Sequence, residues 1–193
     1  MTCSHELPDT KSEITLEQTA ELLKEFRVPK HIIAHSKKVA EVACFLASEL
    51  NKVGYALELS LVDVGALLHD IARIHSIETG DDHTDVGGTW LKEKGFHRVA
   101  DIVRHHVHLP DKEMRISEVA VVNYADKRVM ETTIVDLNER FKDFIQRHGV
   151  TGKELERLDE FRERIKKLEQ NLFLPLPFSP DELVTRIEDE RPV

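Results

Sequence analysis

Residues 57–74 (LELSLVDVGALLHDIARI) are the most apolar stretch of the chain, and they constrain its fold more than any other segment. If this stretch is helical, its apolar positions run almost all the way round the helix. Such a helix has no polar face to present to water, so we expect other helices to bury it on all sides. His69 and Asp70 lie inside this segment, where an ionisable side chain is costly unless it is paired or binds a metal.

Helical signals dominate the rest of the sequence, and no run of alternating β-branched residues between tight turns predicts a strand. Apolar residues recur at helical spacing, Thr15 and Gln18 form a capping box, and Gly54 and Gly149 follow predicted helices as stop signals. The predicted helices cover residues 15–27, 29–51, 57–74, 83–94, 97–107, 116–148 (as one helix or two) and 151–173, with a short final helix after Ser179. The expected fold class is therefore all-α, a helical bundle.

The length of 193 residues is enough for one domain with a substantial core and a helical appendage. We expect the core domain over residues 14–148 and a helical C-terminal extension over residues 149–193. An apolar stripe runs along residues 151–173. We expect this stripe to pack on the same chain, with a homodimer interface as the alternative, so the protein is predicted to be a monomer or a homodimer.

A net formal charge of −9 argues against general nucleic-acid binding, because so acidic a chain gains little from counterion release. A small anionic substrate held by a metal or a local cation remains compatible with this charge. No apolar stretch approaches the roughly 20 residues that span a membrane, and the polar N-terminus lacks the apolar core of a signal peptide. The two cysteines, Cys3 and Cys44, indicate no disulfide framework. We therefore expect a cytoplasmic protein with no membrane partner.

Histidines and aspartates on several predicted helices are candidate metal ligands. His35 lies on the apolar side of its helix, and Asp126 follows the apolar run VAVVNYA. With His69 and Asp70 they are sufficient for one metal ion. Imidazole nitrogens combined with carboxylate oxygens suit Fe, Mn, Co, Ni or Zn better than Ca or Mg alone.

Three further histidines allow a second ion. His83 opens the helix predicted over residues 83–94, and His105 and His106 close the helix predicted over residues 97–107. In a two-metal site an aspartate can bridge the ions, which activate water and hold the attacking and leaving oxygens of a phosphate ester.

The order of these residues resembles the HD-domain superfamily of metal-dependent phosphohydrolases over about residues 29–130. The segments PKHIIAHSKKVAEVACFLASEL and VDVGALLHDIAR are similar to the first two motif helices, and NYADKRV is similar to the closing Asp motif. HTDVGGTWLKEKGF and IVRHH resemble the elements that add histidines in members with two metals, often iron. HDIAR and YADKR are closest to the dinucleoside-tetraphosphate hydrolases, whereas HHVHLPDK lacks the Gly-Tyr-Pro stretch of the cyclic-di-GMP phosphodiesterases.

The resemblance implies a ligand set and an activity. It implies two divalent ions, with Fe or Mn favoured over Zn, Co, Ni and Mg. It also implies hydrolysis of a phosphoester or phosphoanhydride in a nucleotide-type substrate. Asp70 would bridge the ions, with His35, His69 and Asp126 on one ion and His83 with His105, His106 or both on the other.

Three cations beside these ligands are candidates for contact with substrate. Arg73, one turn after the His-Asp pair, is expected either to hold a phosphate oxygen or to form a surface salt bridge. Of Lys127 and Arg128, one is expected to face the substrate and the other to face water. The candidate catalytic set is therefore His69, Asp70, Arg73 and Lys127.

Two other functions would use the same residues. One is a di-iron oxygenase of the HD type, which would act on O₂. The other is a catalytically silent sensor that binds a metal or a nucleotide.

Overall fold

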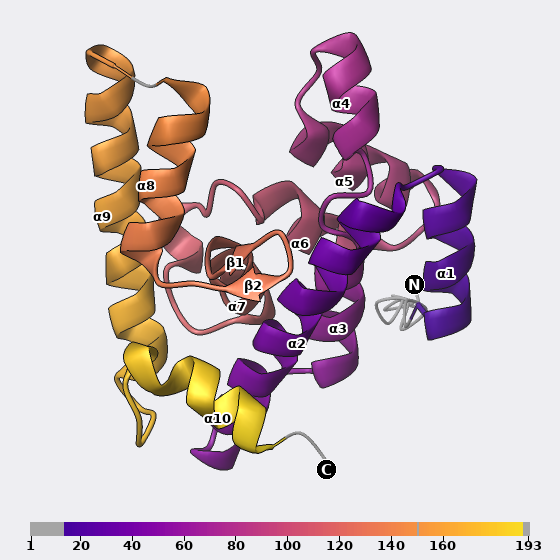
Figure 1. The fold of residues 1–193 in the computed structure, drawn as a ribbon. Coiled ribbons are helices and arrows are strands. Elements are labelled where there is room, and N and C mark those ends of the chain that lie inside the picture. Colours follow the sequence, from indigo (N-terminus) through magenta and orange to yellow (C-terminus); the bar gives the residue numbers. More distant parts are fainter. Residues whose placement is uncertain (1–13, 150, 191–193) are drawn as a thin grey trace, which may run out of the picture.

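The computed structural model describes residues 14–149 and 151–190, and within them the fold is all-α, as predicted. Figure 1 shows the helices in chain order. The helices are α1 (Leu16–Glu25), α2 (Lys30–Lys52), α3 (Leu59–Leu68), α4 (Arg73–Thr79), α5 (His83–Glu93), α6 (His97–His105), α7 (Glu118–Lys127), α8 (Leu137–His148), α9 (Lys153–Phe173) and α10 (Leu183–Asp189), with short 3₁₀ turns at Asp111–Glu113 and Pro180–Glu182. Cys3 lies outside the described residues.

Helix α3 is the centre of the core, as its apolar sequence predicts. It packs against α2, α6 and α7, and Val62, Ala66 and Leu68 are fully buried. Gly65 allows α6 to approach closely, because a Cβ atom at this position would lie 2.7 Å from the Cδ1 atom of Ile102. No helix among residues 14–149 and 151–190 has the length and apolar character needed to cross a membrane.

The predicted helix over residues 57–74 is in fact two helices. Helix α3 ends at Leu68, the chain turns, and α4 begins at Arg73. Within the turn, the Ile71 N–H donates to the Leu68 carbonyl and the Arg73 N–H donates to the Asp70 carbonyl, both at 3.0 Å. Successive side chains on a continuous helix point about 100° apart. The turn instead allows His69 and Asp70 to face one cluster, and the sequence contains no proline or glycine at the break to reveal it.

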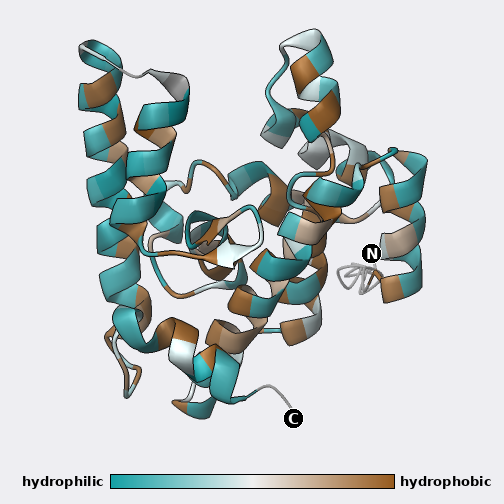
Figure 2. Cartoon of the chain, viewed as in Figure 1, coloured by the Kyte–Doolittle hydropathy of each residue, from teal (hydrophilic) through white to brown (hydrophobic). Residues whose placement is uncertain are grey.

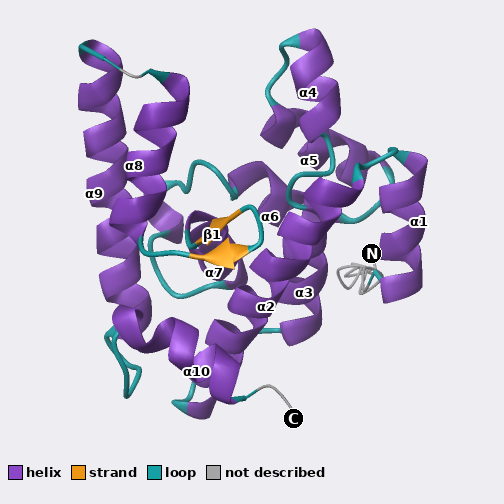
Figure 3. Cartoon of the chain, in the orientation of Figure 1, coloured by secondary structure: helices purple, strands orange, loops and turns teal. Residues whose placement is uncertain are grey.

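The region predicted as one helix or two over residues 116–148 contains two helices separated by a β-hairpin. Strands β1 (Val129–Met130) and β2 (Thr133–Ile134) pair antiparallel, with Val129 opposite Ile134; they are the orange arrows in Figure 3. The expectation of no strands is therefore wrong at this point. Glu131 adopts a positive φ of 56° in the turn, where a hairpin sequence usually has Gly or Asn, so the usual signal is missing.

The C-terminal segments pack back onto the same chain. Helices α8 and α9 form an antiparallel pair (Figure 1), and the predicted boundary at residues 148–149 falls at the tip of this hairpin. Figure 2 shows apolar bands on an otherwise hydrophilic α9. The bands in its second half, including Leu168 and Leu172, are fully buried. The guanidinium of buried Arg128 binds the Tyr124 hydroxyl and the Pro180 carbonyl, which joins α7 to the C-terminal region.

Replacing Gly65 with valine should destabilise the protein by roughly 1–3 kcal/mol, because its side chain would overlap Ile102 in a filled core. Urea unfolding measures this loss. The double variant G65V/I102A should lose less than the sum of the single variants, since the smaller residue makes space. If the two losses of stability were strictly additive, the close contact between α3 and α6 at Gly65 and Ile102 would be contradicted.

Candidate functional site

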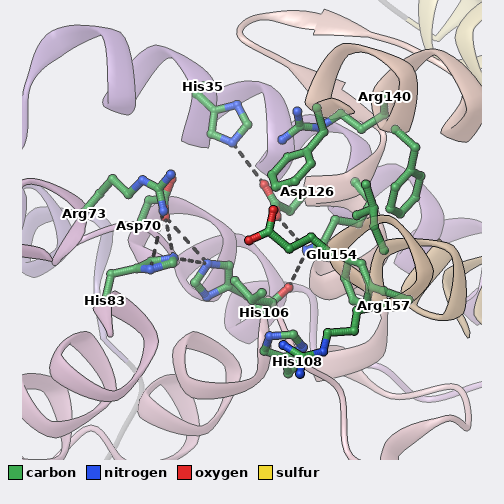
Figure 4. Close-up of a pocket in the computed structure, with 16 residues that line it drawn as sticks. His35, Asp70, Arg73, His83, His106, His108, Asp126, Arg140, Glu154 and Arg157 are labelled. Atoms are coloured by element: carbon green, nitrogen blue, oxygen red, sulfur yellow. Dashed lines mark hydrogen bonds and ion pairs between the residues drawn. The ribbon is translucent and has the colours of Figure 1, made fainter. Parts of the chain in front are cut away.

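Six of the predicted ligands converge on one point in the structure, although they come from five separate segments. Figure 4 shows the five that line a cavity, and the sixth, His69, is fully buried. The residues are His35 on α2, His69 and Asp70 in the turn between α3 and α4, His83 at the start of α5, His106 directly after α6, and Asp126 on α7.

One half of the cluster is centred on Asp126. Its Oδ1 atom lies 3.1 Å from His35 Nε2 and 3.5 Å from His69 Nε2. The Oδ2 atom of Asp70 lies 3.7 Å from the same His69 nitrogen. Two carboxylates and two imidazoles therefore direct four ligand atoms toward one region.

The other half uses the second oxygen of Asp70. Asp70 Oδ1 lies 3.3 Å from His83 Nε2 and 3.6 Å from His106 Nε2. The two imidazole nitrogens are 3.2 Å apart. Because its two oxygens face different halves of the cluster, Asp70 occupies the position that a bridging ligand would need.

Backbone carbonyls fix the orientation of three of these histidines. The Nδ1 atoms lie 2.9 Å from the Glu131 carbonyl for His35, and 2.7 Å from the Ala66 and Val103 carbonyls for His69 and His106. A carbonyl oxygen only accepts hydrogen bonds, so each Nδ1 must carry the proton. The Nε2 atoms then face the cluster, and each offers a lone pair to a metal when its ring is neutral.

Burial keeps the second pair of histidines neutral. It lowers the pKa of His83 to about 4, with the neighbouring His106 acting in the same direction. Burial also lowers the pKa of the His106 imidazole. Near pH 7 both rings are therefore in the neutral form that a metal requires.

The two carboxylates remain ionised despite burial. Burial alone would raise the pKa of Asp126, but the Lys127 ammonium and the neighbouring His35 and His69 imidazoles hold it well below its usual value. Burial would likewise lower the pKa of His69, but Asp70 and Asp126 raise it to about 9. In the metal-free protein, a proton on His69 therefore supplies part of the positive charge that these carboxylates need.

The residues fit a divalent metal. His69 Nε2 is buried without a hydrogen-bond partner among the described residues, and it faces both carboxylates. Three overlapping groups of ligand atoms, each within 4.8 Å of one another, cover the six residues. A mixed set of imidazole nitrogens and carboxylate oxygens suits a first-row transition ion.

The structure separates His105 from His106, which the sequence left undecided. His105 turns back along α6, with Nδ1 3.0 Å from the Asp101 carbonyl and 3.2 Å from its carboxylate, and it is outside the cluster. The amide of buried Asn123 donates to the carbonyls of both histidines at 2.8 and 2.9 Å. It fixes the end of α6, and one turn further along its own helix is Asp126. Sequence analysis missed this role of Asn123.

The three candidate cations occupy different environments. The Lys127 ammonium donates to Asp126 Oδ2 at 2.8 Å and to the His106 carbonyl at 2.7 Å, so it supports the cluster directly. Arg73 lines the cavity with Nη1 3.5 Å from His83 Nδ1, and it forms no ion pair with any described carboxylate. The expectation that Lys127 or Arg128 faces water is wrong, because both are buried.

The cavity of about 690 Å³ extends from the cluster to the α8–α9 hairpin. The hairpin contributes residues that sequence analysis did not assign to the site. Its Phe161 and Leu158 belong to the apolar stripe along residues 151–173, which the sequence predicts to be a packing surface. Arg157 and Phe161 are four residues apart, and this spacing places them on one helical face. That spacing was the available signal, but only the fold shows what this face meets. The other hairpin residues at the cavity are Arg140, Phe141, Phe144 and Glu154.

Comparison with known families supports the same assignment. The HD domain family matches residues 32–131, just over half of the chain. An uncharacterized protein of Methanocaldococcus jannaschii is 30% identical over 154 residues, which cover 72% of this chain and 90% of the relative. The chain therefore belongs to the HD domain family, within the superfamily of metal-dependent phosphohydrolases.

Other relatives align over smaller shares of their own length. Ribonuclease Y of Aquifex aeolicus is 35% identical over 98 residues, half of this chain and 16% of the ribonuclease. A tRNA (cytidine(56)-2'-O)-methyltransferase of Thermoplasma volcanium is 27% identical over 169 residues, 84% of this chain and 48% of the methyltransferase. No solved structure matches the chain.

We expect the metal-free protein to be most stable near pH 6.5. Between about pH 4 and 6.5, the unfolded chain binds a proton at His83 that the folded protein does not, so stability rises with pH. Between 6.5 and about 9, folded His69 keeps a proton that the unfolded chain has lost, so stability falls. Urea unfolding of chelator-treated protein at a series of pH values measures both changes in stability. If H69Q lost as much stability as wild type between pH 6.5 and about 9, the assignment to His69 would be contradicted.

Replacing His106 with glutamine should weaken metal binding by at least about tenfold, because changing even the partners of metal ligands costs that much. His105→Gln is the matched control, and we expect it to stay within about twofold of wild type, since His105 faces away from the cluster. Chelator competition measures both affinities. Equal losses in the two variants would refute the assignment of His106.

Proposed function

We propose that the protein is a metal-dependent phosphohydrolase that cleaves a phosphoester or phosphoanhydride bond of a nucleotide-type substrate. The observation that carries this proposal is the convergence of six metal-ligand side chains at one end of a cavity that also contains arginines. The family resemblance supplies the phosphate chemistry, and the motif HDIAR with YADKR favours dinucleoside polyphosphates among the substrates to test.

His35, His69, Asp70 and Asp126 would hold one ion, and Asp70, His83 and His106 would hold a second, with Asp70 shared. Bound divalent ions of this type activate water and neutralise charge on phosphoryl oxygens.

The protein's own groups prepare this chemistry. Backbone carbonyls hold three imidazoles in the tautomer that directs Nε2 inward. Lys127 keeps Asp126 ionised and oriented. Arg73 lies beside His83 at the cavity without a carboxylate partner among the described residues, where its planar guanidinium can bind two oxygens of the scissile phosphate.

The direct experiment is metal analysis of anaerobically purified protein, followed by assays on mononucleotides, dinucleoside polyphosphates and cyclic dinucleotides. We expect Fe or Mn and metal-dependent release of phosphate or of a nucleotide. Stoichiometric metal without turnover of any phosphoester would contradict the proposal, and oxygen consumption in the same preparation would favour the di-iron oxygenase.

Replacing Asp70 with asparagine should lower kcat/KM by roughly a hundredfold or more, because the metals supply several kcal/mol of transition-state stabilisation. The matched control is Asp63→Asn, which removes a half-buried carboxylate on α3 that does not line the cavity. We expect D63N to retain activity. Comparable losses in both variants, or activity in D70N with unchanged metal content, would count against the proposed site.

A further inference from the structure

The cavity has two walls of different origin. The metal cluster forms one wall, within residues 32–131 that match the HD domain family. The opposite wall comes from α8 and α9, which lie outside that match. The cavity volume of about 690 Å³ is much larger than one phosphate group requires. It lies in the range of cavities that enclose whole small molecules. The hairpin wall is therefore placed to contact whatever is attached to the phosphate.

The hairpin wall presents aromatic surface to the cavity. Phe144 on α8 lines the cavity and is 39% exposed. On α9, the ring of Phe161 is held edge-on by Phe141, with ring centres 5.8 Å apart, and by His108 at 5.6 Å. Such rings can stack on a nucleobase, which is a favourable contact for every base because each has a π-face.

The hairpin also places two arginines at the cavity, Arg140 and Arg157, that have a weak carboxylate partner or none among the described residues. Arg147, Arg162 and Arg164, which do not line the cavity, each have a carboxylate oxygen within 3.1 Å. Among the described residues, Arg157 has no such partner. Arg140 forms one long ion pair, with Asp143 at 4.0 Å, and its Nε atom is buried without a hydrogen-bond partner among the described residues. The two hairpin arginines at the cavity are thus less tightly paired than Arg147, Arg162 and Arg164, and their guanidinium groups can bind an external anion.

The charge of the cavity differs in sign from that of the whole chain. Arg73, Lys127, Arg140 and Arg157 line it together with three carboxylates, those of Asp70, Asp126 and Glu154. These residues leave an excess of one positive charge even before any metal binds, in a protein of net charge −9. An anionic ligand is therefore attracted to this cavity specifically.

We propose that the α8–α9 hairpin is the specificity-determining wall of the site and selects nucleotides that carry a second phosphate. The base stacks on Phe144 and Phe161, while Arg140 and Arg157 bind the phosphate that is not cleaved. This inference rests on the proposed function, because it assumes that the metal cluster holds the scissile phosphate.

Four ligands separate the two contacts. Ribose 5-phosphate has neither a base nor a second phosphate, and AMP adds the base. ADP and adenosine 3',5'-bisphosphate add a second phosphate at opposite ends of the ribose. For each ligand, kcat/KM of the metal-loaded enzyme and the dissociation constant by calorimetry are measured. We expect at least one of the two doubly phosphorylated nucleotides to have a higher kcat/KM and a lower dissociation constant than AMP. We expect AMP, in turn, to exceed ribose 5-phosphate in both respects.

Two variants test the wall directly. Arg157→Gln should reduce the preference for the second phosphate by about tenfold or more, because it removes hydrogen bonds to a charged group. Phe144→Leu should reduce the preference for AMP over ribose 5-phosphate by roughly fivefold, since it keeps apolar volume but removes the ring. Phe144→Tyr, which keeps an aromatic ring, should retain the wild-type preference for AMP over ribose 5-phosphate.

The matched control is Lys142→Gln, which removes an exposed cation from α8 that does not line the cavity. It should change none of the preferences, and circular dichroism should show all variants folded. Equal effects of R157Q on all four ligands, or no effect of either variant, would overturn the proposal. If wild type binds the ligands in the expected order but hydrolyses none, the proposed function fails while the assignment of the wall stands.

Discussion

The burial of two carboxylates, Asp70 and Asp126, is the constraint on which the rest of this structure depends. Each lies within a helical core that would favour the neutral acid, yet both stay ionised because cationic and hydrogen-bond donor groups surround them. Lys127 supplies one positive charge, and a proton on His69 supplies part of the remainder. A divalent ion would meet the same requirement more completely, so the charge of the cluster fits metal binding.

The scaffold around these carboxylates fixes the positions of the side chains in the cluster. Most residues of helix α3 are buried, and the chain turns directly after it, so that the His-Asp pair starts from a fixed position. Asn123 holds the end of α6, where His106 enters the cluster, and the β-hairpin supplies the Glu131 carbonyl that orients His35. Side chains far apart in sequence are thus held by backbone groups rather than by flexible surface contacts.

In the proposed function, one part of the molecule carries the reaction and another selects the substrate. The residues that match the HD domain family carry the metal cluster, whereas the α8–α9 hairpin, outside that match, closes the cavity with arginines and aromatic rings. Because the family match covers residues 32–131 and not the hairpin, family membership supports the reaction class more strongly than any substrate.

The sequence by itself determined the all-α class and the largely buried central helix, and it predicted the histidines and aspartates that could bind a metal, because apolar periodicity and costly buried charges are local properties of the chain. It could not determine the turn after Leu68 or the β-hairpin at Glu131, since neither has the glycine or proline that usually marks such sites. Only the tertiary structure decided between His105 and His106, because adjacent residues on a helix differ by direction and not by composition. It alone brought the C-terminal hairpin to the cavity, since the packing of distant segments depends on contacts that no local pattern records.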